Sequence, residues 1–300
     1  MDTRTIGSLT VSVVGLGCNN FGMRIGRTET AAVVEAALDS GITLFDTADI
    51  YGGTKSETYL GAALGSRRDE IVLATKYGVP YEGHEGGASP AYIRTALDDS
   101  LKRLGTDRID LYQQHLPDPK TPIADTLGTL AELKAEGKIR EFGCSNFDAA
   151  MLDAAPAFAS VQNQYSVLHR EPEDEVLAAC ARLGVAFLPY FPLASGLLSG
   201  KYHAGEAPPE GTRMAAWGEE RSKKELSDER LATVAALDAL ARSEGHAVLD
   251  LAFAWLLSHP EVASVIAGAT SADQVAANVA AGAWRPSAEL LAQVDAIAPR

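Results

Sequence analysis

Residues 28–48 have the sequence TETAAVVEAALDSGITLFDTA, in which a helical stretch is followed at once by a short β-branched stretch. Thr28 is the expected N-cap of the helix, because a threonine hydroxyl accepts hydrogen bonds from the first backbone N–H groups. Gly41 is the expected left-handed residue that ends the helix. The apolar face predicted for this helix contains Ala31, Val34 and Leu38. The strand over 42–48 then completes one helix–strand unit of an α/β fold.

The same alternation of strand and helix extends along the whole chain. A helix with the apolar stripe Ile93, Leu97, Leu101 and Leu104 is predicted to begin at Ser89-Pro90 and to end at Gly105. Eight such units in 300 residues predict an α/β fold of the (β/α)8 TIM-barrel type, formed as one domain over 1–300. A doubly wound sheet is the alternative, but no G-x-G-x-x-G motif follows a strand. The strands are predicted at 13–18, 42–48, 71–76, 109–115, 140–145, 160–165, 184–190 and 262–267.

Two segments depart from this repeat. Residues 4–11 predict an N-terminal β-hairpin that covers the floor of the barrel. The connection between Tyr190 and Val262 is much longer than the others, and its part over 202–230 is rich in glycine, proline and charge. Long loops without secondary structure are usually functional lids or disordered. We therefore expect a long loop that covers a ligand.

Composition narrows the class of protein. The net charge of −14 argues against nucleic acid and anionic membranes as partners. The three cysteines Cys18, Cys144 and Cys180 have no zinc spacing and form no disulfide framework. The polar N-terminus and the absence of a long apolar run predict a cytoplasmic protein, either a monomer or a homo-oligomer.

Polar residues recur where the predicted strands end. Active sites of (β/α)8 barrels are built at the carboxyl ends of the strands. A single polar residue there has an ordinary explanation as a solvated strand end, whereas a series of them indicates one site. The series is Asp46, Lys76, His115, Ser145 with Asn146, Gln162 or Gln164, and Tyr190.

Tyr51 follows Asp46 by five residues, and the glycines after it allow a tight turn that brings the phenol over the strand end. An ammonium such as that of Lys76 favours the phenolate and lowers the pKa of a tyrosine, and Asp46 would hold this ammonium in place. His115 adds a hydrogen-bonding group for an oxygen that becomes negative. These residues fit the protonation of a developing alkoxide. A metal site fits poorly, because one histidine and one aspartate leave the coordination incomplete.

The chain resembles the aldo-keto reductase superfamily, and within it the bacterial-type members related to the branch that contains the potassium-channel β subunits. The resemblance rests on motifs spread over the whole chain: residues 15–22 (GLGCNNFG), 45–52 (FDTADIYG), 74–76 (ATK), 100–115 (SLKRLGTDRIDLYQQH), 137–140 (GKIR), 143–147 (GCSNF), 162–166 (QNQYS), 192–202 (PLASGLLSGKY) and 268–270 (GAT), with Gln274 and Asn278.

The resemblance implies an NADP(H)-dependent enzyme that reduces a small-molecule carbonyl substrate, an aldehyde or ketone, to an alcohol. Tyr51 is then the proton donor, tuned by Lys76 and Asp46, and His115 orients the carbonyl oxygen. Three groups of residues are implied to bind NADPH or NADP+. The nicotinamide would contact Ser145, Asn146, Gln162 and Tyr190. The pyrophosphate would lie beside Phe191, Pro192, Leu193, Ala194, Ser195, Lys201 and Arg213. The remaining contacts are expected from Gly17, Cys18 and Asn19 and, at the adenosine 2′-phosphate and adenine, from Gly268, Thr270, Gln274 and Asn278.

Two positions depart from the family pattern. Many members carry an arginine that grips the 2′-phosphate where this chain has Gln274, and Phe191 stands where serine is more common. The substrate pocket is expected between the loops 20–24 and 77–89 and the long connection around Trp217. Its apolar wall would consist of Phe21, Tyr77, Tyr81 and Trp217, and a structural or lid role is the alternative for these residues.

Two other functions remain alternatives. One is an NADP(H)-binding regulatory or sensor subunit with vestigial catalysis, although the channel subunits lack the histidine that stands here as His115. The other is an aldolase-like barrel with Lys76 as the Schiff-base residue, which leaves the predicted cofactor residues unexplained.

Overall fold

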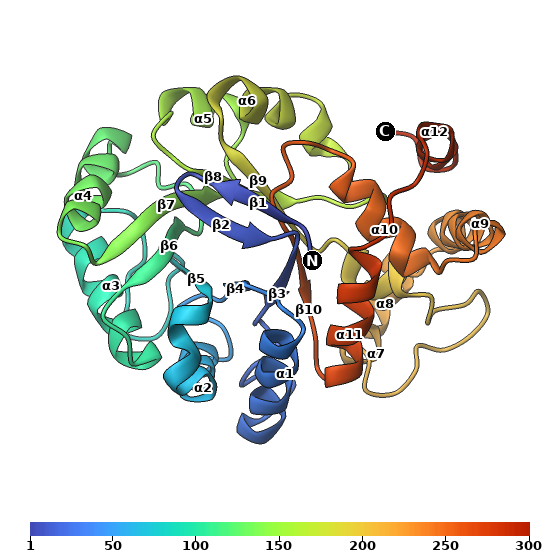
Figure 1. Ribbon diagram of the computed structural model, residues 1–300, viewed down its shortest axis with the longest axis horizontal. Coiled ribbons are helices and arrows are strands. Elements are labelled where there is room, and N and C mark those ends of the chain that lie inside the picture. Colours follow the sequence, from blue (N-terminus) through green and yellow to red (C-terminus); the bar gives the residue numbers. More distant parts are fainter.

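Eight parallel strands in the described backbone form a barrel with helices around its outside (Figure 1). The computed structural model describes the backbone of residues 1–300 and every side chain except those of Glu219, Arg221 and Lys223. The barrel confirms the predicted fold class and all eight predicted strands. These are β3 (Val14–Gly17), β4 (Leu44–Asp46), β5 (Val72–Tyr77), β6 (Ile109–Gln114), β7 (Ile139–Ser145), β8 (Ser160–Gln164), β9 (Ala186–Tyr190) and β10 (Val265–Gly268).

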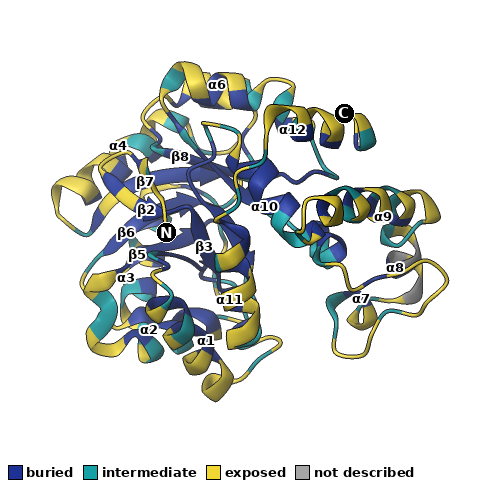
Figure 2. Ribbon diagram, turned by 45° about the vertical axis from the view of Figure 1, so that its right-hand side comes forward, coloured by how far each residue is buried: buried dark blue, intermediate teal, exposed yellow. Residues whose placement is uncertain are grey.

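The strands are buried on both faces, as expected for a parallel sheet that helices cover on one side and a packed interior fills on the other. Every residue of β5 and of β6 is buried, and Figure 2 shows the barrel strands as the buried centre of the molecule. The sheet has the order β10-β3-β4-β5-β6-β7-β8-β9. Phe187 of β9 closes the circle, because its N–H donates to the Glu261 carbonyl (2.8 Å) and its carbonyl accepts from the Ala263 N–H (2.9 Å).

The helices cover the outer face of the barrel through their apolar sides. In α3 the Ser89 side chain accepts from the Tyr92 N–H, Pro90 occupies the first turn, and Gly105 ends the helix with φ 65°, as predicted. The surrounding helices are α1 (Arg27–Asp39), α2 (Lys55–Leu64), α3 (Pro90–Leu104), α4 (Ile123–Ala135), α5 (Ala149–Ala154), α6 (Val176–Leu183), α9 (Asp228–Ser243), α10 (Val248–Leu257), α11 (Ala272–Ala281) and α12 (Ala288–Ile297), with 3-10 turns η1 (Gly65–Glu70) and η2 (Glu171–Glu173).

Helix α1 begins earlier than the sequence suggested. Its N-cap is Gly26, without a side-chain hydrogen bond, so the prediction that Thr28 caps the helix is wrong. The Thr30 hydroxyl instead donates to the Gly26 carbonyl (2.8 Å). Val34 and Leu38 are buried as predicted, and the buried face also includes Thr30, Val33 and Ala37. Ala31, by contrast, is exposed. Gly41 ends this region with φ 79°, as expected.

The N-terminal hairpin crosses the end of the barrel opposite the active-site loops (Figure 1). It consists of β1 (Thr3–Ile6) and β2 (Leu9–Ser12), joined at Gly7 with φ 54°. Ile6, Leu9 and Val11 are at most 1% exposed. They pack against inward-facing residues of the barrel such as Leu44, Leu111 and Leu188. The predicted hairpin is thus a hydrophobic floor to the barrel.

The long connection between β9 and β10 is more ordered than the sequence suggested. It begins with the 3-10 segment η3 (Ala194–Ser199) and contains α7 (Arg213–Ala216) and α8 (Glu219–Glu225) before α9 and α10. The part over 202–230 that is rich in glycine, proline and charge is therefore a loop only in its first half, because the Thr212 hydroxyl accepts from the Ala215 N–H and begins α7. Residues 203–212, called the strap below, contain neither helix nor strand.

Candidate active site

A cavity of about 800 Å³ opens at the carboxyl ends of the barrel strands. A volume of this order lies within the range of about 300 to 1,000 Å³ that is typical of pockets for small organic ligands and cofactors. Of the site residues predicted from the sequence, Lys76 and Ala194 lie beneath its surface. The others line it: Gly17, Cys18, Asn19, Asp46, Tyr51, His115, Ser145, Asn146, Gln162, Tyr190, Phe191, Pro192, Leu193, Ser195, Lys201, Arg213, Gly268, Thr270, Gln274 and Asn278.

Asp46, Lys76 and Tyr51 form one connected group at the bottom of this cavity. The Lys76 ammonium is fully buried and donates to Asp46 Oδ2 (2.6 Å) and to the Thr47 carbonyl (2.9 Å). Lys76 Nζ also lies 5.2 Å from the centroid of the Tyr51 ring and interacts with its hydroxyl. The turn after Tyr51 has Gly52 and Gly53 at φ 61° and 62°, as the sequence predicted.

The pKa of Tyr51 lies above its ordinary value of 10.0, because desolvation of the phenol outweighs the opposing effect of Lys76. The expected lowering by the ammonium is therefore present but smaller than the effect of burial. The pKa of Lys76 is also raised from its ordinary value, since Asp46 and Tyr51 together exceed the burial that lowers it. The lysine is thus a stable buried cation beside a neutral phenol that carries its proton.

His115 stands across the cavity from this pair. Its ring centroid lies 5.9 Å from that of Tyr51, with the rings nearly perpendicular. Burial, with a contribution from the Lys76 charge, lowers the pKa of His115 to about 3. The imidazole is therefore neutral at physiological pH, and its Nδ1 has no hydrogen-bond partner among the described atoms.

The strand ends of β7 to β9 hold a row of amides and hydroxyls. The Gln162 amide donates to Asp46 Oδ1 (3.0 Å), which joins this row to the buried lysine. Ser145 Oγ donates to the Gln162 carbonyl (2.6 Å), and the Asn146 amide donates to the His115 carbonyl (3.0 Å). The Tyr190 hydroxyl in turn donates to Asn146 Oδ1 (2.9 Å). These bonds hold the wall of the cavity in place for a ligand.

The turn after β9 has an unusual backbone. Phe191, Ala194 and Ser195 have φ values of 52°, 46° and 59°, a region that non-glycine residues rarely occupy. Such strained positions concentrate at functional sites. Phe191, the departure noted in the sequence, carries the Arg213 guanidinium over its ring at 5.4 Å. Lys201 comes from the same connection and also lines the cavity.

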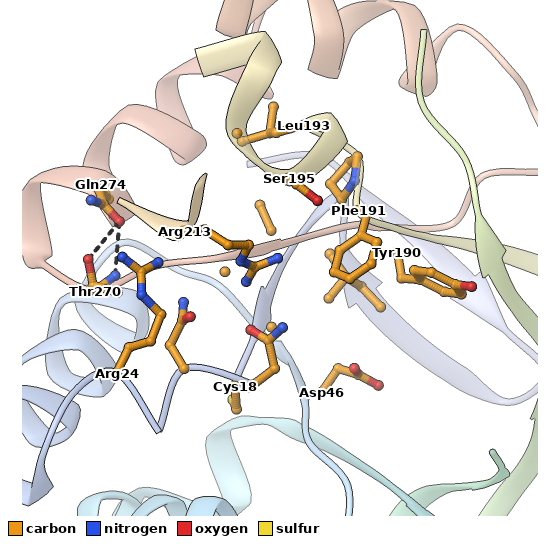
Figure 3. Close-up of a pocket in the computed structure, with 18 of the residues that line it drawn as sticks. Cys18, Arg24, Asp46, Tyr190, Phe191, Leu193, Ser195, Arg213, Thr270 and Gln274 are labelled. Carbon is orange, nitrogen blue, oxygen red and sulfur yellow. Dashed lines mark hydrogen bonds between the residues drawn. The ribbon is translucent and has the colours of Figure 1, made fainter. Parts of the chain in front are cut away.

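The opposite rim is formed by the loops after β3 and β10. The Asn20 amide donates to the Ala269 carbonyl (3.3 Å) and so joins these loops. At Gly268 a Cβ atom would lie 3.0 Å from the Asn20 amide nitrogen, so the absence of a side chain keeps this rim open. Gln274 Oε1 accepts hydrogen bonds from the Thr270 N–H (2.9 Å) and hydroxyl (3.2 Å), as Figure 3 shows.

Comparison with known proteins assigns this barrel to a family. Residues 13–299 match the Aldo/keto reductase family. The chain belongs to the aldo/keto reductase family.

Relatives of this aldo/keto reductase include a probable aldo-keto reductase 1 from Glycine max, 32% identical over 96% of this chain and 86% of the relative. The aldo-keto reductase YhdN of Bacillus subtilis (strain 168) is 36% identical over 93% of this chain and 87% of its own length. A solved structure, the holo form of aldo-keto reductase AKR11C1 from Bacillus halodurans, matches with a TM-score of 0.84 and 34% identity, covering 99% of this chain and 96% of that one. The protein is thus an oxidoreductase of a family that uses nicotinamide cofactors. No helix in the described chain has both the length and the apolar character needed to cross a membrane.

Of the two roles expected for the aromatic residues near the substrate pocket of this aldo/keto reductase, the structure supports the structural one and not the apolar wall. Phe21 and Tyr77 are fully buried, and Tyr77 stacks on Tyr112 between sheet and helices at 4.7 Å. Phe21, Tyr77, Tyr81 and Trp217 are absent from the described residues that line the cavity, whereas Val79 and Leu116 are among its apolar lining residues. Side chains alternate along a strand, so Tyr77 must face outward if its neighbour Lys76 faces inward.

Asp49 is a buried group of this aldo/keto reductase that the sequence analysis did not single out. Its side chain is 0% exposed, and its N–H donates to the Lys76 carbonyl (3.2 Å). No described side chain hydrogen-bonds its carboxylate oxygens, and among backbone groups only the Ile50 N–H is placed to stabilise the charge. Burial, and next the charge of Glu57, raise the pKa of Asp49 to about 7, against the opposing charges of Arg103 and Lys76.

Proposed function

We propose that this aldo/keto reductase reduces an aldehyde or ketone with NADPH and that Tyr51 supplies the proton. The observation that supports the proposal most directly is the arrangement of a protonated phenol, a buried ammonium and a neutral imidazole at the bottom of one cavity. A carbonyl oxygen placed between Tyr51 and His115 would meet two hydrogen-bonding groups, which stabilise the negative charge that develops during reduction.

The rest of the cavity fits an anionic dinucleotide. Lys201 and Arg213 bring positive charge to one side, beside the strained turn that begins at Phe191. The carboxamide of a nicotinamide would find polar partners in Ser145, Asn146 and Gln162 at the strand ends. Asn278, on the same helix as Gln274, would contact the adenine. A bound reduced nicotinamide supplies the hydride that reaches the carbonyl carbon.

The residues of the chain then perform the acid–base part of the reaction. His115 orients the carbonyl oxygen, and Tyr51 transfers its phenolic proton to that oxygen as the alcohol forms. The Lys76 ammonium stabilises the phenolate that remains, and Asp46 fixes the lysine through the 2.6 Å contact. In the direction of alcohol oxidation the same phenolate would act as the base.

The rate at which NADPH absorbance decreases in the presence of a panel of aldehydes and ketones tests this proposal. Tyr51→Phe should reduce kcat by about 10²- to 10⁴-fold, the usual contribution of a general acid, and leave NADPH affinity nearly unchanged. Tyr59→Phe is the matched control, since Tyr59 lies on the neighbouring helix α2 outside the cavity and should keep the wild-type rate.

Wild-type turnover retained in Tyr51→Phe would remove Tyr51 as the proton donor. NADPH binding without reduction of any carbonyl would instead support the regulatory alternative. Trapping of a Lys76 adduct by borohydride would support an aldolase-like reaction, which the buried, charged state of Lys76 disfavours.

A further inference from the structure

The loop after β3 places a third cation at the cavity, Arg24. Its backbone lies in the segment 20–24, which the sequence assigned to the substrate side. The structure places its guanidinium on the cofactor side instead, where it donates from Nη2 to the Gly211 carbonyl of the strap (2.5 Å). Figure 3 draws Arg24 together with Arg213, Thr270 and Gln274, all of which line the same cavity.

The electrostatics of Lys201 agree with a convergence of the three cations. Burial lowers the pKa of Lys201 from its ordinary value, and the charges of Arg24 and Arg213 lower it further. Like charges gathered at a cavity repel one another, and an anionic ligand relieves this repulsion. A dinucleotide with a pyrophosphate and a 2′-phosphate offers two such anionic groups.

The N–H and hydroxyl of Thr270 are two further hydrogen-bond donors for the second anionic group, the 2′-phosphate. Gln274 Oε1 accepts from both the N–H and the hydroxyl of Thr270, and so occupies the position that a phosphate oxygen would take. The glutamine is neutral and exposed, so it can turn away from these donors but brings no charge to a phosphate. The charge must come from another element of the fold.

We propose that Arg24 pairs with the 2′-phosphate of NADPH and thereby selects NADPH over NADH, an inference that rests on the proposed cofactor. A guanidinium can pair with two phosphate oxygens at once and still has N–H groups left for the Gly211 carbonyl. Arg24, in the loop after β3, thus supplies at this cavity the positive charge that the neutral Gln274 does not. The hydrogen bond from Arg24 to the Gly211 carbonyl also connects the strap to the loop after β3.

Equilibrium binding in the absence of a carbonyl tests this inference, by protein fluorescence with NADPH, NADH, adenosine 2′,5′-bisphosphate and ADP as ligands. In Arg24→Gln the Kd of the two ligands with a 2′-phosphate should increase about 10- to 100-fold, the usual effect of losing a charged hydrogen-bond partner. The Kd of NADH and of ADP should stay within about twofold of wild type. Arg24→Lys, which keeps the charge but loses the fork, should fall between wild type and Arg24→Gln.

Arg27→Gln is the matched control, because Arg27 is three residues away, exposed, and lies over Tyr59 outside the cavity. It should bind all four ligands as the wild type does. Equal losses for all four ligands in Arg24→Gln would assign Arg24 to the pyrophosphate or to the strap alone and overturn the inference, as would no loss at all. Arg24-dependent binding of the bisphosphate without carbonyl reduction would uphold the inference while the proposed reductase function failed.

Discussion

Replacing Asp49 by asparagine should stabilise the protein at neutral and alkaline pH. Asp49 is buried between elements that carry Glu57, Arg103 and Lys76, and the hydroxyls of Tyr92 and Tyr112 nearby also lack described partners. An asparagine has almost the same shape and does not ionise. The substitution therefore removes the cost of a buried charge and keeps the packing.

The magnitude follows from the pKa of Asp49, which is about 7 in the folded protein against an ordinary value of 3.8. Because the folded state binds this proton more tightly than the unfolded state, stability is lost as the pH rises from the lower value to the higher, and the loss is complete above it. Each pKa unit corresponds to about 1.4 kcal/mol, so the full loss is roughly 4 kcal/mol. Between about pH 5 and pH 8 the loss of folding stability increases by roughly 3 kcal/mol.

Denaturant unfolding of wild type and Asp49→Asn, followed by circular dichroism at both pH values, measures this difference. The free energy of unfolding of the variant should exceed that of the wild type by several kcal/mol at the higher pH and by much less at the lower. Asp107→Asn is the control, since the Asp107 side chain is 88% exposed and its replacement should have the same small effect at both. A variant that is equally destabilised at both pH values would show that Asp49 is ionised and paired, and would refute the reasoning.

Two further predictions concern the cavity. His115→Gln should lower the rate of carbonyl reduction by the same factor at about pH 5 and pH 8, because a ring with a pKa of about 3 is neutral at both; a factor that changes over this range would mean that the ring takes up a proton. Thr270→Ala should weaken NADPH binding about 3- to 10-fold and NADH binding less, as measured by fluorescence titration, because the hydroxyl that Gln274 Oε1 now occupies would be lost to the 2′-phosphate. Equal losses for the two cofactors would remove Thr270 from that site.

The barrel was predictable because its signals are local and repeated. Most of the strands are short apolar runs with a polar residue at or near their carboxyl end, so the order of residues along the chain was enough to place Asp46, Lys76 and His115 at one rim. Helix α3 was equally clear, since Ser89, Pro90 and Gly105 each have a backbone requirement that marks a helix end. The start of α1 was missed because Gly26 caps it without a side chain, and the buried position of Thr30 has no apolar signature.

The site was less predictable wherever a loop decides the position of a side chain. Arg24 and Asp49 both lie in connections, where no periodicity states the direction of the side chain. Arg24 reaches the cofactor side through a contact with Gly211, a residue far along the chain. The buried state of Asp49 depends on α2 and α3 packing over its loop, which composition alone does not reveal. The sequence predicted a lowered pKa for Tyr51, whereas the structure gives a raised one, because desolvation depends on the assembled cavity.

The hydrophobic floor made by the hairpin has a consequence for the supply of protons. Ile6, Leu9 and Val11 fill one end of the barrel and Lys76 is fully buried, whereas Tyr51 lines the cavity that opens at the other end. On the proposed chemistry, each turnover takes one proton from the phenol. We expect the proton that restores the Tyr51 phenol to enter through the cavity mouth by which the alcohol departs. Reprotonation of Tyr51 would then follow product release.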